Sequence, residues 1–329
     1  MTASRGRVAV IGAGVAGLTC AHYLEQKGWA IDVYDKSRGM GGRLSAKRVD
    51  GLGTVDLGAQ FFTVQTPEFS SFIERATKAG LVQPWAARVS YIGPNGVEPA
   101  TQQTRWLGVP AMNSWLELLW PRSKIRFDYT VEKLVRTPEK LWRLNNSDAS
   151  YDYVILALPP AQAAALAVGT ELEVALSQIT MNPCWAGLAI FEAPLEVDFD
   201  AAFVRVGGLD WIAANHRKPG RTVHPAAWTL HAGPLLSRQI LELAPEEVKP
   251  HLLEALATAL GRQLPKGQVA LVHKWRYASP ASPGSPGILC SSDAALGAGG
   301  DWAVGGRVEG AFTAGRLLAA AVEQRTPQS

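Results

Sequence analysis

Cysteine is scarce in this sequence, and the cysteines lie far apart. Cys20, Cys184 and Cys290 form no C-x-x-C pair, and no histidine stands near them at the spacing of a metal site. This pattern excludes a disulfide framework and gives no sign of a zinc or iron–sulfur centre. We therefore expect a protein without bound metal that works in the reducing cytoplasm.

Charge and long apolar runs are also in short supply. Only 19% of the 329 residues are charged, and the net charge of +3 is too small an excess to predict a nucleic-acid partner. The apolar run 154–168 is broken by two prolines and is shorter than the roughly 20 residues that span a bilayer. Glycines interrupt the apolar run 8–20, which argues against a secretory signal. We expect no association with membranes.

What the sequence does contain is enough apolar residues, 47%, for one large domain or two interleaved ones. Its first clear pattern is a buried strand over 7–11, a helix over 15–27 that stops at Gly28, and a second strand over 30–34. These three elements predict a β-α-β unit of the expected size.

The turn inside this unit has the pattern G-x-G-x-x-G. Its first glycine allows the sharp bend, its second lets the backbone approach a pyrophosphate, and its third packs the helix on the strand. Asp35 ends the second strand, where a carboxylate binds a ribose hydroxyl. An ordinary strand-turn-helix with a surface aspartate is the alternative. The residues predicted to bind a dinucleotide are Gly12, Ala13, Gly14, Val15, Ala16, Gly17 and Asp35.

Helical and β patterns alternate along the rest of the chain. We expect helices over 68–79, 111–120, 246–260 and 308–324, strands over 124–135, 141–144, 152–157, 185–191 and 227–231, and short β segments within 82–100. The run 153–158 is too continuously apolar for a surface strand, so we expect it to rejoin the parallel sheet that starts at 7–11. The stretch 279–287, rich in Pro, Gly and Ser, is the best linker candidate.

The order of these elements predicts an α/β fold with two interleaved domains. A Rossmann-type dinucleotide-binding domain would comprise residues 1–65, 107–162 and 286–329. A smaller α+β substrate domain would comprise residues 66–106 and 163–285.

Residues 35–43 favour FAD over NAD as the dinucleotide. Gly41 and Gly42 permit close backbone approach, and Arg43, with Lys36 nearby, is placed to reach the pyrophosphate. A solvated basic loop is the alternative. An acid, a short spacer and G-G-R after the glycine turn resemble the flavoprotein superfamily that holds the amine oxidases. The resemblance implies an amine oxidase or p-hydroxybenzoate hydroxylase-like topology.

Three further segments resemble cofactor-binding segments of that superfamily. Residues 56–63 resemble the segment beside the flavin, residues 300–311 resemble the second FAD signature, and Val131 resembles the residue whose backbone contacts adenine. The start of the last helix would direct its positive dipole end at the flavin. The implied contacts are Gly58, Ala59, Gln60, Phe61, Val131, Gly300, Asp301, Arg307, Val308 and Glu309. A simple turn at 56–63 and a plain strand valine at 131 remain open.

From end to end the chain resembles the bacterial renalases most. The resemblance is carried by residues 35–43, 56–60, 105–110, 209–215, 228–231, 273–278, 300–302 and 306–310. It implies an oxidase of isomeric dihydronicotinamide dinucleotides, with hydride transfer to flavin N5, oxygen as acceptor, and NAD(P)+ and hydrogen peroxide as products. Since such a substrate is electron-rich, positioning would suffice without a strong base.

The same resemblance points to candidate site residues. Asn215 and His231 resemble active-site positions of the family, and Gln60, Trp185, Tyr277 and Trp302 are possible walls of the substrate site. Ordinary core packing is the alternative for the histidine and the tryptophans. For the basic run 215–221 we favour a solvated loop, and contact with substrate phosphates is the alternative. The surroundings of Cys290 do not resemble a covalent flavin attachment site, so we expect FAD to bind non-covalently.

Two other functions stay open at this point. A flavin-containing amine oxidase would want a lysine over flavin N5 and an aromatic pair around the amine, and the sequence places neither. A flavin-binding protein without redox activity, or an isomerase, would keep the same fold. The oligomeric state is not predicted.

Overall fold

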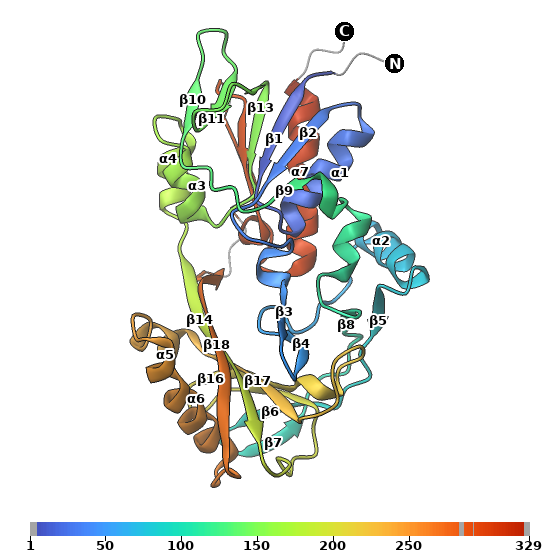
Figure 1. The fold of residues 1–329 in the computed structure, drawn as a ribbon, viewed down its shortest axis with the longest axis vertical. Coiled ribbons are helices and arrows are strands. Elements are labelled where there is room, and N and C mark those ends of the chain that lie inside the picture. The colour runs from blue at the N-terminus through green and yellow to red at the C-terminus, as the bar shows by residue number, and fades with distance from the viewer. Residues whose placement is uncertain (1–4, 283–285, 292, 326–329) are drawn as a thin grey trace.

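The computed structural model describes residues 5–282, 286–291 and 293–325, which form two lobes (Figure 1). The upper lobe in Figure 1, which we call the first lobe, is built on a six-stranded sheet in the order β19-β20-β13-β1-β2-β9. All neighbours in it are parallel except β19 and β20. Its strands are β1 (Arg7–Ile11), β2 (Ala30–Tyr34), β9 (Ile125–Arg126), β13 (Tyr153–Leu156), β19 (Leu289–Cys290) and β20 (Leu296–Ala298).

This sheet is covered on both faces, which explains its apolar strands. Val8 and Val10 pack toward α1 (Val15–Gln26) and α7 (Val308–Arg325), whereas Ala9 and Ile11 pack toward α3 (Pro160–Leu166) and α4 (Leu172–Ser177). A small sheet of β10 (Leu134–Arg136), β11 (Trp142–Leu144) and β12 (Ser150–Tyr151) flanks the second face. The predicted return of the chain to the parallel sheet is confirmed, because β13 pairs with β1 in parallel register.

The lower lobe is built on a seven-stranded mixed sheet, the second sheet, in the order β18-β14-β17-β16-β15-β6-β7. One of its faces packs against α5 (Pro234–Gln239) and α6 (Pro245–Leu260), and the other faces the first lobe (Figure 1). Its strands are β6 (Val89–Gly93), β7 (Gly96–Pro99), β14 (Met181–Phe191), β15 (Ala201–Val204), β16 (Leu209–Ala214), β17 (Ala227–Ala232) and β18 (Gly267–Pro280). Together the two sheets confirm the predicted α/β fold, with a Rossmann-type parallel sheet in one lobe and a mixed sheet in the other.

Short elements connect the lobes. The hairpin of β3 (Ala46–Val49) and β4 (Gly53–Asp56) leads from the first lobe to the face of the second sheet. Helix α2 (Pro67–Lys78) follows, and β5 (Val82–Pro84) pairs with β8 (Trp106–Gly108). Within the described ranges, no helix is both long and apolar enough to cross a bilayer.

Two predicted elements are wrong in extent. The predicted helix 111–120 is a short 3-10 helix, Ser114–Leu118, and the Ser114 hydroxyl accepts a hydrogen bond from the Ala111 N–H, an interaction that competes with helix formation. The predicted strand 124–135 is interrupted between β9 and β10. There the N–H groups of Asp128 and Tyr129 donate to Ser37 and Asp35, so a tertiary contact replaces the strand ladder.

The linker prediction is correct only in part. Ser279 and Pro280 still belong to β18, and the irregular segment begins at Ala281. Residues 283–285 of the predicted linker lie outside the described residues.

Candidate active site

The first glycine turn has the geometry that its pattern predicts. Gly12 has φ +109°, and a Cβ there would lie 2.4 Å from the Ala157 carbonyl oxygen. A Cβ on Gly17 would lie 1.9 Å from the Gly12 carbonyl oxygen, so only glycine lets α1 start this close to β1. A Cβ on Gly14 would meet nothing within 4 Å. The first and third glycines are therefore required by packing, and the second faces open space.

A second glycine loop faces the first one. Gly41 (φ +115°) donates its N–H to the Ala13 carbonyl at 2.8 Å, and the nearest atom to a Cβ on Gly42 would be the Gly14 Cα at 3.9 Å. We call Gly12–Gly17 together with Gly41 and Gly42 the glycine cradle. Gly14 is the N-cap of α1 and has no side chain, so the helix N-terminus is open toward the cradle. Residues Ala13, Val15 and Ala16 of the turn are largely buried around it.

The cradle suits a pyrophosphate because it offers backbone N–H groups, a helix N-terminus and room that side chains would fill. The Asp35 carboxylate at its edge accepts N–H hydrogen bonds from Ala13 and Ser37, both at 2.7 Å. It retains acceptor capacity for ribose hydroxyls. Lys36 is exposed, and Val131 is buried in the loop after β9 rather than in a strand.

Arg43 joins the cradle to the C-terminal signature. Its guanidinium pairs with both oxygens of Asp301, which is mostly buried, and donates to the Ala278 carbonyl at 3.0 Å. The Arg43 carbonyl accepts the Ala59 N–H at 2.9 Å, and a Cβ on Gly58 would lie only 2.0 Å from that carbonyl oxygen. The structure thus brings together segments separated by up to 258 positions.

The remaining residues of the C-terminal signature lie at the start of α7. Gly300 precedes Asp301, Arg307 is exposed, and Val308 opens the helix. The buried carboxylate of Glu309 accepts hydrogen bonds from the Gln65 and Thr66 N–H groups and from the Thr66 hydroxyl. The Glu309 side chain therefore fixes the loop that precedes α2.

A cluster of buried charged side chains contacts residues 56–60. One oxygen of Asp56 receives Lys218 Nζ at 3.2 Å and the Arg221 Nε and Nη2 at 3.1 and 2.8 Å. Lys218 also donates to Gln60 Oε1 at 2.9 Å, and Gln60 Nε2 donates to the Asp56 and Gly58 carbonyls. The other Asp56 carboxylate oxygen is buried without a hydrogen-bond partner among the described residues.

This cluster corrects the interpretation of 215–221 as a solvated loop. The side chains of Lys218 and Arg221 have no exposed surface, and both point at Asp56. Burial and the neighbouring Arg221 together lower the pKa of Lys218 to about 8, although Asp56 opposes the shift. Two cations share one carboxylate, so the cluster carries excess positive charge at neutral pH.

His231 lies on the face of the second sheet that meets the first lobe. Its Nε2 is 3.1 Å from the Leu57 carbonyl oxygen, which also accepts the Trp275 Nε1–H at 2.8 Å. Because a carbonyl only accepts, Nε2 must carry the proton. Burial lowers the pKa of His231 to about 4, with a further contribution from Lys218, so the ring is neutral at neutral pH.

The other predicted wall residues have different positions. Asn215 is buried and clamps β4, accepting from the Asp56 N–H and donating to the Thr54 carbonyl. Tyr277 is partly buried on β18, two residues beyond Trp275. Trp185 packs on the α5 and α6 side of the sheet and donates to the Ile240 carbonyl, and Trp302 lies in the core of the first lobe and donates to the Leu158 carbonyl. Neither side chain therefore lies with His231 on the face of the second sheet that meets the first lobe.

His231 belongs to a row of residues across the second sheet whose other members sequence reasoning missed. Each pairs with the next on the adjacent strand, so all lie on one line across the sheet. The row is His273, Ala186, His231, Trp211, Phe203 and Tyr91. Phe61, next to Gln60, packs on Trp211 and Phe203 with ring centroids 5.3 and 6.2 Å apart. We call Phe61, Trp211, Phe203 and Tyr91 the aromatic row.

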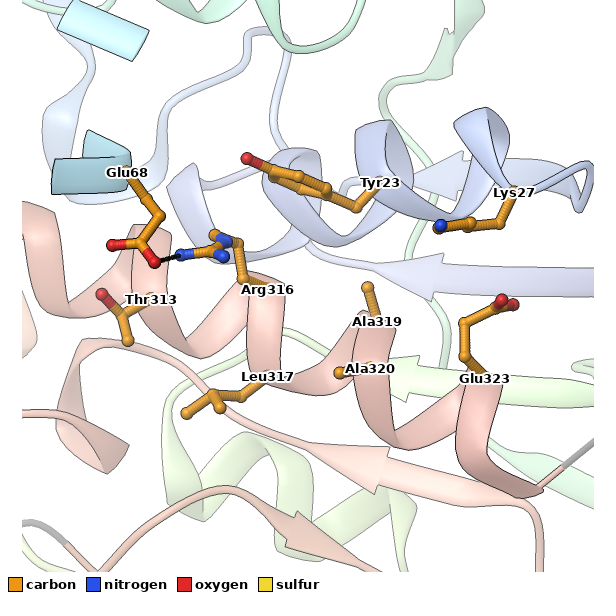
Figure 2. A pocket seen from close by; sticks show the side chains of 9 residues that line it. All are labelled: Tyr23, Lys27, Glu68, Thr313, Arg316, Leu317, Ala319, Ala320 and Glu323. Carbon is orange, nitrogen blue, oxygen red and sulfur yellow. Dashed lines mark ion pairs between the residues drawn. The ribbon is translucent and has the colours of Figure 1, made fainter. Parts of the chain in front are cut away.

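A separate groove lies outside this site, between α1 and α7 (Figure 2). It has a volume of about 420 Å³, and Arg316 pairs with Glu68 at 3.3 Å across one end of it. Tyr23 and Leu317 contribute apolar surface, and Lys27 and Glu323 lie at the other end (Figure 2). None of the predicted site residues lines this groove.

Comparison with known families agrees with this geometry. Residues 10–76 match the family model described as NAD(P)-binding Rossmann-like domain, and residues 100–323 match the model described as flavin containing amine oxidoreductase. The first match contains the glycine cradle, and the second contains Phe203 and Trp211 of the aromatic row together with Tyr277 and Asp301.

Curated relatives match over short stretches only. A zeta-carotene-forming phytoene desaturase of Myxococcus xanthus is 46% identical over 52 residues, 16% of this chain and 10% of the relative. Protoporphyrinogen oxidase 2, chloroplastic/mitochondrial, of Arabidopsis thaliana is 36% identical over 92 residues, 28% of this chain and 18% of the relative. The matched stretches thus span less than a fifth of each of these relatives.

Solved structures match over nearly the whole chain, at low identity. A putative protoporphyrinogen oxidase from Exiguobacterium sp. 255-15 has a TM-score of 0.76 and 14% identity, covering 98% of this chain and 99% of that one. A cyclohexylamine oxidase from Brevibacterium oxydans IH-35A has a TM-score of 0.71 and 15% identity, covering 97% and 99%. At such identity these likenesses establish the fold.

Proposed function

Because the chain belongs to the flavin-containing amine oxidoreductase family, it is a flavin-dependent oxidoreductase, and we propose that its substrate is an isomeric dihydronicotinamide dinucleotide. The substrate would give up a hydride and leave as NAD(P)+, and oxygen would take the two electrons to form hydrogen peroxide. FAD, when bound, supplies the two-electron acceptor.

The glycine cradle supports this proposal at the cofactor end. Gly14 and Gly42 would face the FAD pyrophosphate at the N-terminus of α1, and Asp35 would hold the adenosine ribose. Asp301, fixed by Arg43, would lie toward the flavin end with the start of α7. Gly58 and Ala59, packed on the Arg43 backbone, would lie beside the flavin ring.

The charge of the buried site is the observation that favours this substrate. Among the described residues, three buried cations pair with Asp56 or lie over Phe61, namely Lys218, Arg221 and Arg105, and Asp56 is the one anion among these partners. Excess positive charge in a buried site attracts phosphates and repels an ammonium group. A neutral His231 and the aromatic row suit a flat, uncharged dihydropyridine ring, which needs no strong base.

Anaerobic titration of the FAD-loaded enzyme tests the substrate. We expect 1,2-dihydro-NAD to bleach the visible absorbance of the flavin stoichiometrically, and the same mixture in air to yield hydrogen peroxide and NAD+. A panel of primary and secondary amines should leave the flavin oxidised. Bleaching by amines and none by dihydronicotinamides would contradict the proposal.

Amine oxidation is the second candidate, and the comparisons favour it. The matched family model is named for amine oxidation, and solved structures of putrescine oxidase and cyclohexylamine oxidase share the fold. Lys218, with its pKa lowered to about 8, and the rings of the aromatic row would then surround a neutral amine. If neither amines nor dihydronicotinamides reduce the flavin, the protein would instead be a flavin-binding protein without oxidase activity.

A further inference from the structure

Arg105 is a buried cation without an anion. Only 6% of its surface is exposed, and no carboxylate within the described part of the chain pairs with its guanidinium. Its Nε has no hydrogen-bond partner there, and its two terminal nitrogens reach the Gln103 and Thr101 carbonyls only at 3.5 and 3.4 Å. These distances lie at the limit of hydrogen bonding.

Such an arrangement is costly for a folded protein. A buried charge is normally paired, because burial removes its hydration. Desolvation accordingly lowers the pKa of Arg105, and the hydroxyl-bearing ring of Tyr91 is the neighbour that opposes this. A ligand that brings a negative charge would remove the cost, so the unpaired guanidinium is evidence of a ligand site.

The neighbours of Arg105 connect it to the substrate face. Its guanidinium lies over the Phe61 ring at 5.4 Å, and Phe61 packs on Trp211. Trp211 is itself 5% exposed, and its Nε1–H has no acceptor among the described residues. A charged donor and a neutral donor, both unpartnered, therefore flank the same phenyl ring next to Gln60.

We propose that Arg105 binds a phosphate group of the substrate, at the end of the aromatic row away from His231. This inference rests on the proposed function for the identity of the substrate, but the anion site itself does not. A guanidinium with free Nε–H and weakly held terminal N–H groups can form a bidentate pair with phosphate oxygens. The aromatic row would separate the phosphate from the redox-active ring near Gly58 and Ala59.

Binding of inorganic pyrophosphate to the FAD-loaded enzyme tests the anion site without any substrate. Saturation with FAD keeps the glycine cradle occupied. We expect Arg105→Met to weaken pyrophosphate binding about 10- to 100-fold by calorimetry, and Arg105→Lys to weaken it less. Arg136→Met is the matched control, because Arg136 also has a buried unpartnered nitrogen but lies on β10 in the small flanking sheet.

Three outcomes of these binding measurements would refute the anion site. If wild type binds no pyrophosphate at millimolar concentration, or if Arg105→Met binds it as wild type does, the site is refuted. Equal losses in the Arg105 and Arg136 variants would also refute it. Flavin absorbance and thermal unfolding of each variant establish that it folds and holds FAD.

A kinetic comparison then tests whether the anion belongs to the substrate. We expect Arg105→Met to raise KM for dihydronicotinamide mononucleotide about tenfold more than KM for the riboside, which lacks the phosphate. Equal losses for both compounds would contradict phosphate binding. If wild type oxidises neither compound while pyrophosphate binding still depends on Arg105, the proposed function fails and the anion site stands.

Discussion

His231 and the Leu57 carbonyl show how one hydrogen bond fixes a protonation state. The bond needs a proton on Nε2, and burial disfavours a second proton on the ring. His231 can therefore position a substrate or the 57–58 backbone, but it cannot act as a cationic acid at neutral pH. The nearby cationic Lys218 reinforces this state.

The lowered pKa of His231 predicts acid sensitivity. Between pH 6.5 and about 4 the unfolded chain binds a proton on this residue and the folded chain does not, so stability falls as pH falls. The loss is at most about 3 kcal/mol. We expect His231→Gln, which keeps an N–H donor, to lose less stability than wild type between pH 7 and pH 5 in urea unfolding. Equal losses in both proteins would show that His231 does not titrate this way.

At the scale of elements, the strand-turn-helix of β1 and α1 assigns different tasks to its glycines. Gly17 is required by packing, since a Cβ would lie 1.9 Å from a carbonyl oxygen. Gly14 has an ordinary φ of −83° and faces open space, so alanine fits there in the absence of ligand. Packing thus requires Gly17, whereas at Gly14 the absence of a side chain leaves the cradle open.

This difference predicts opposite behaviour of two alanine variants. Gly17→Ala should lower the free energy of unfolding of the FAD-free protein by about 2–3 kcal/mol, because backbone must move. Gly14→Ala should leave that stability within roughly 1 kcal/mol but weaken FAD binding at least about tenfold, because its methyl enters the cradle. Urea unfolding and FAD titration measure the two effects. Unchanged FAD affinity in Gly14→Ala would show that the cradle does not bind the pyrophosphate.

Elements with strong local patterns were predictable, and the buried charges were not. Within the first 35 residues, the β-α-β unit has a glycine turn, apolar residues at helical spacing and a glycine that ends the helix. Lys218 and Arg221, by contrast, are buried because of Asp56, which lies 162 and 165 positions away, and no local pattern reveals that partner. A basic run without its counter-charge resembles a solvated loop.

The two faces of the second sheet explain why the position of Trp185 could not be predicted from the sequence. Alternation along β14 and β16 separates two faces, but helices cover one and the first lobe covers the other, so both are apolar. Trp185 and Trp211 therefore look equivalent in sequence. Tertiary contacts, such as the packing of Phe61 against Trp211 and the His231–Leu57 hydrogen bond, identify the face that meets the candidate site.

At the scale of the whole molecule, distant segments meet at the proposed cofactor site. Residues 12–17, 41–43, 58–59 and 301 are joined by the Gly41, Ala59 and Asp301 contacts. A ligand that touches all of these segments binds the folded state alone. Its binding free energy therefore adds to the stability of the whole chain.

The Arg43–Asp301 pair predicts a variant in which FAD binding stabilises the chain less. Arg43→Ala leaves a carboxylate that is mostly buried without its partner and loosens the contact between the cradle and α7. Wild type should gain about 2.7 kcal/mol of stability at FAD concentrations 100-fold above Kd. At the same concentration the variant should gain less and should lose its yellow colour on gel filtration.

Arg48→Ala is the control for this prediction, because Arg48 is exposed on the neighbouring hairpin. Thermal unfolding with and without added FAD measures the gain in each protein. If Arg43→Ala retains its flavin and gains as much stability as wild type, the pair serves the apoprotein fold alone, and the pyrophosphate is held by the glycine cradle without it. A loss shared equally by Arg48→Ala would instead indicate a general effect of removing a positive charge.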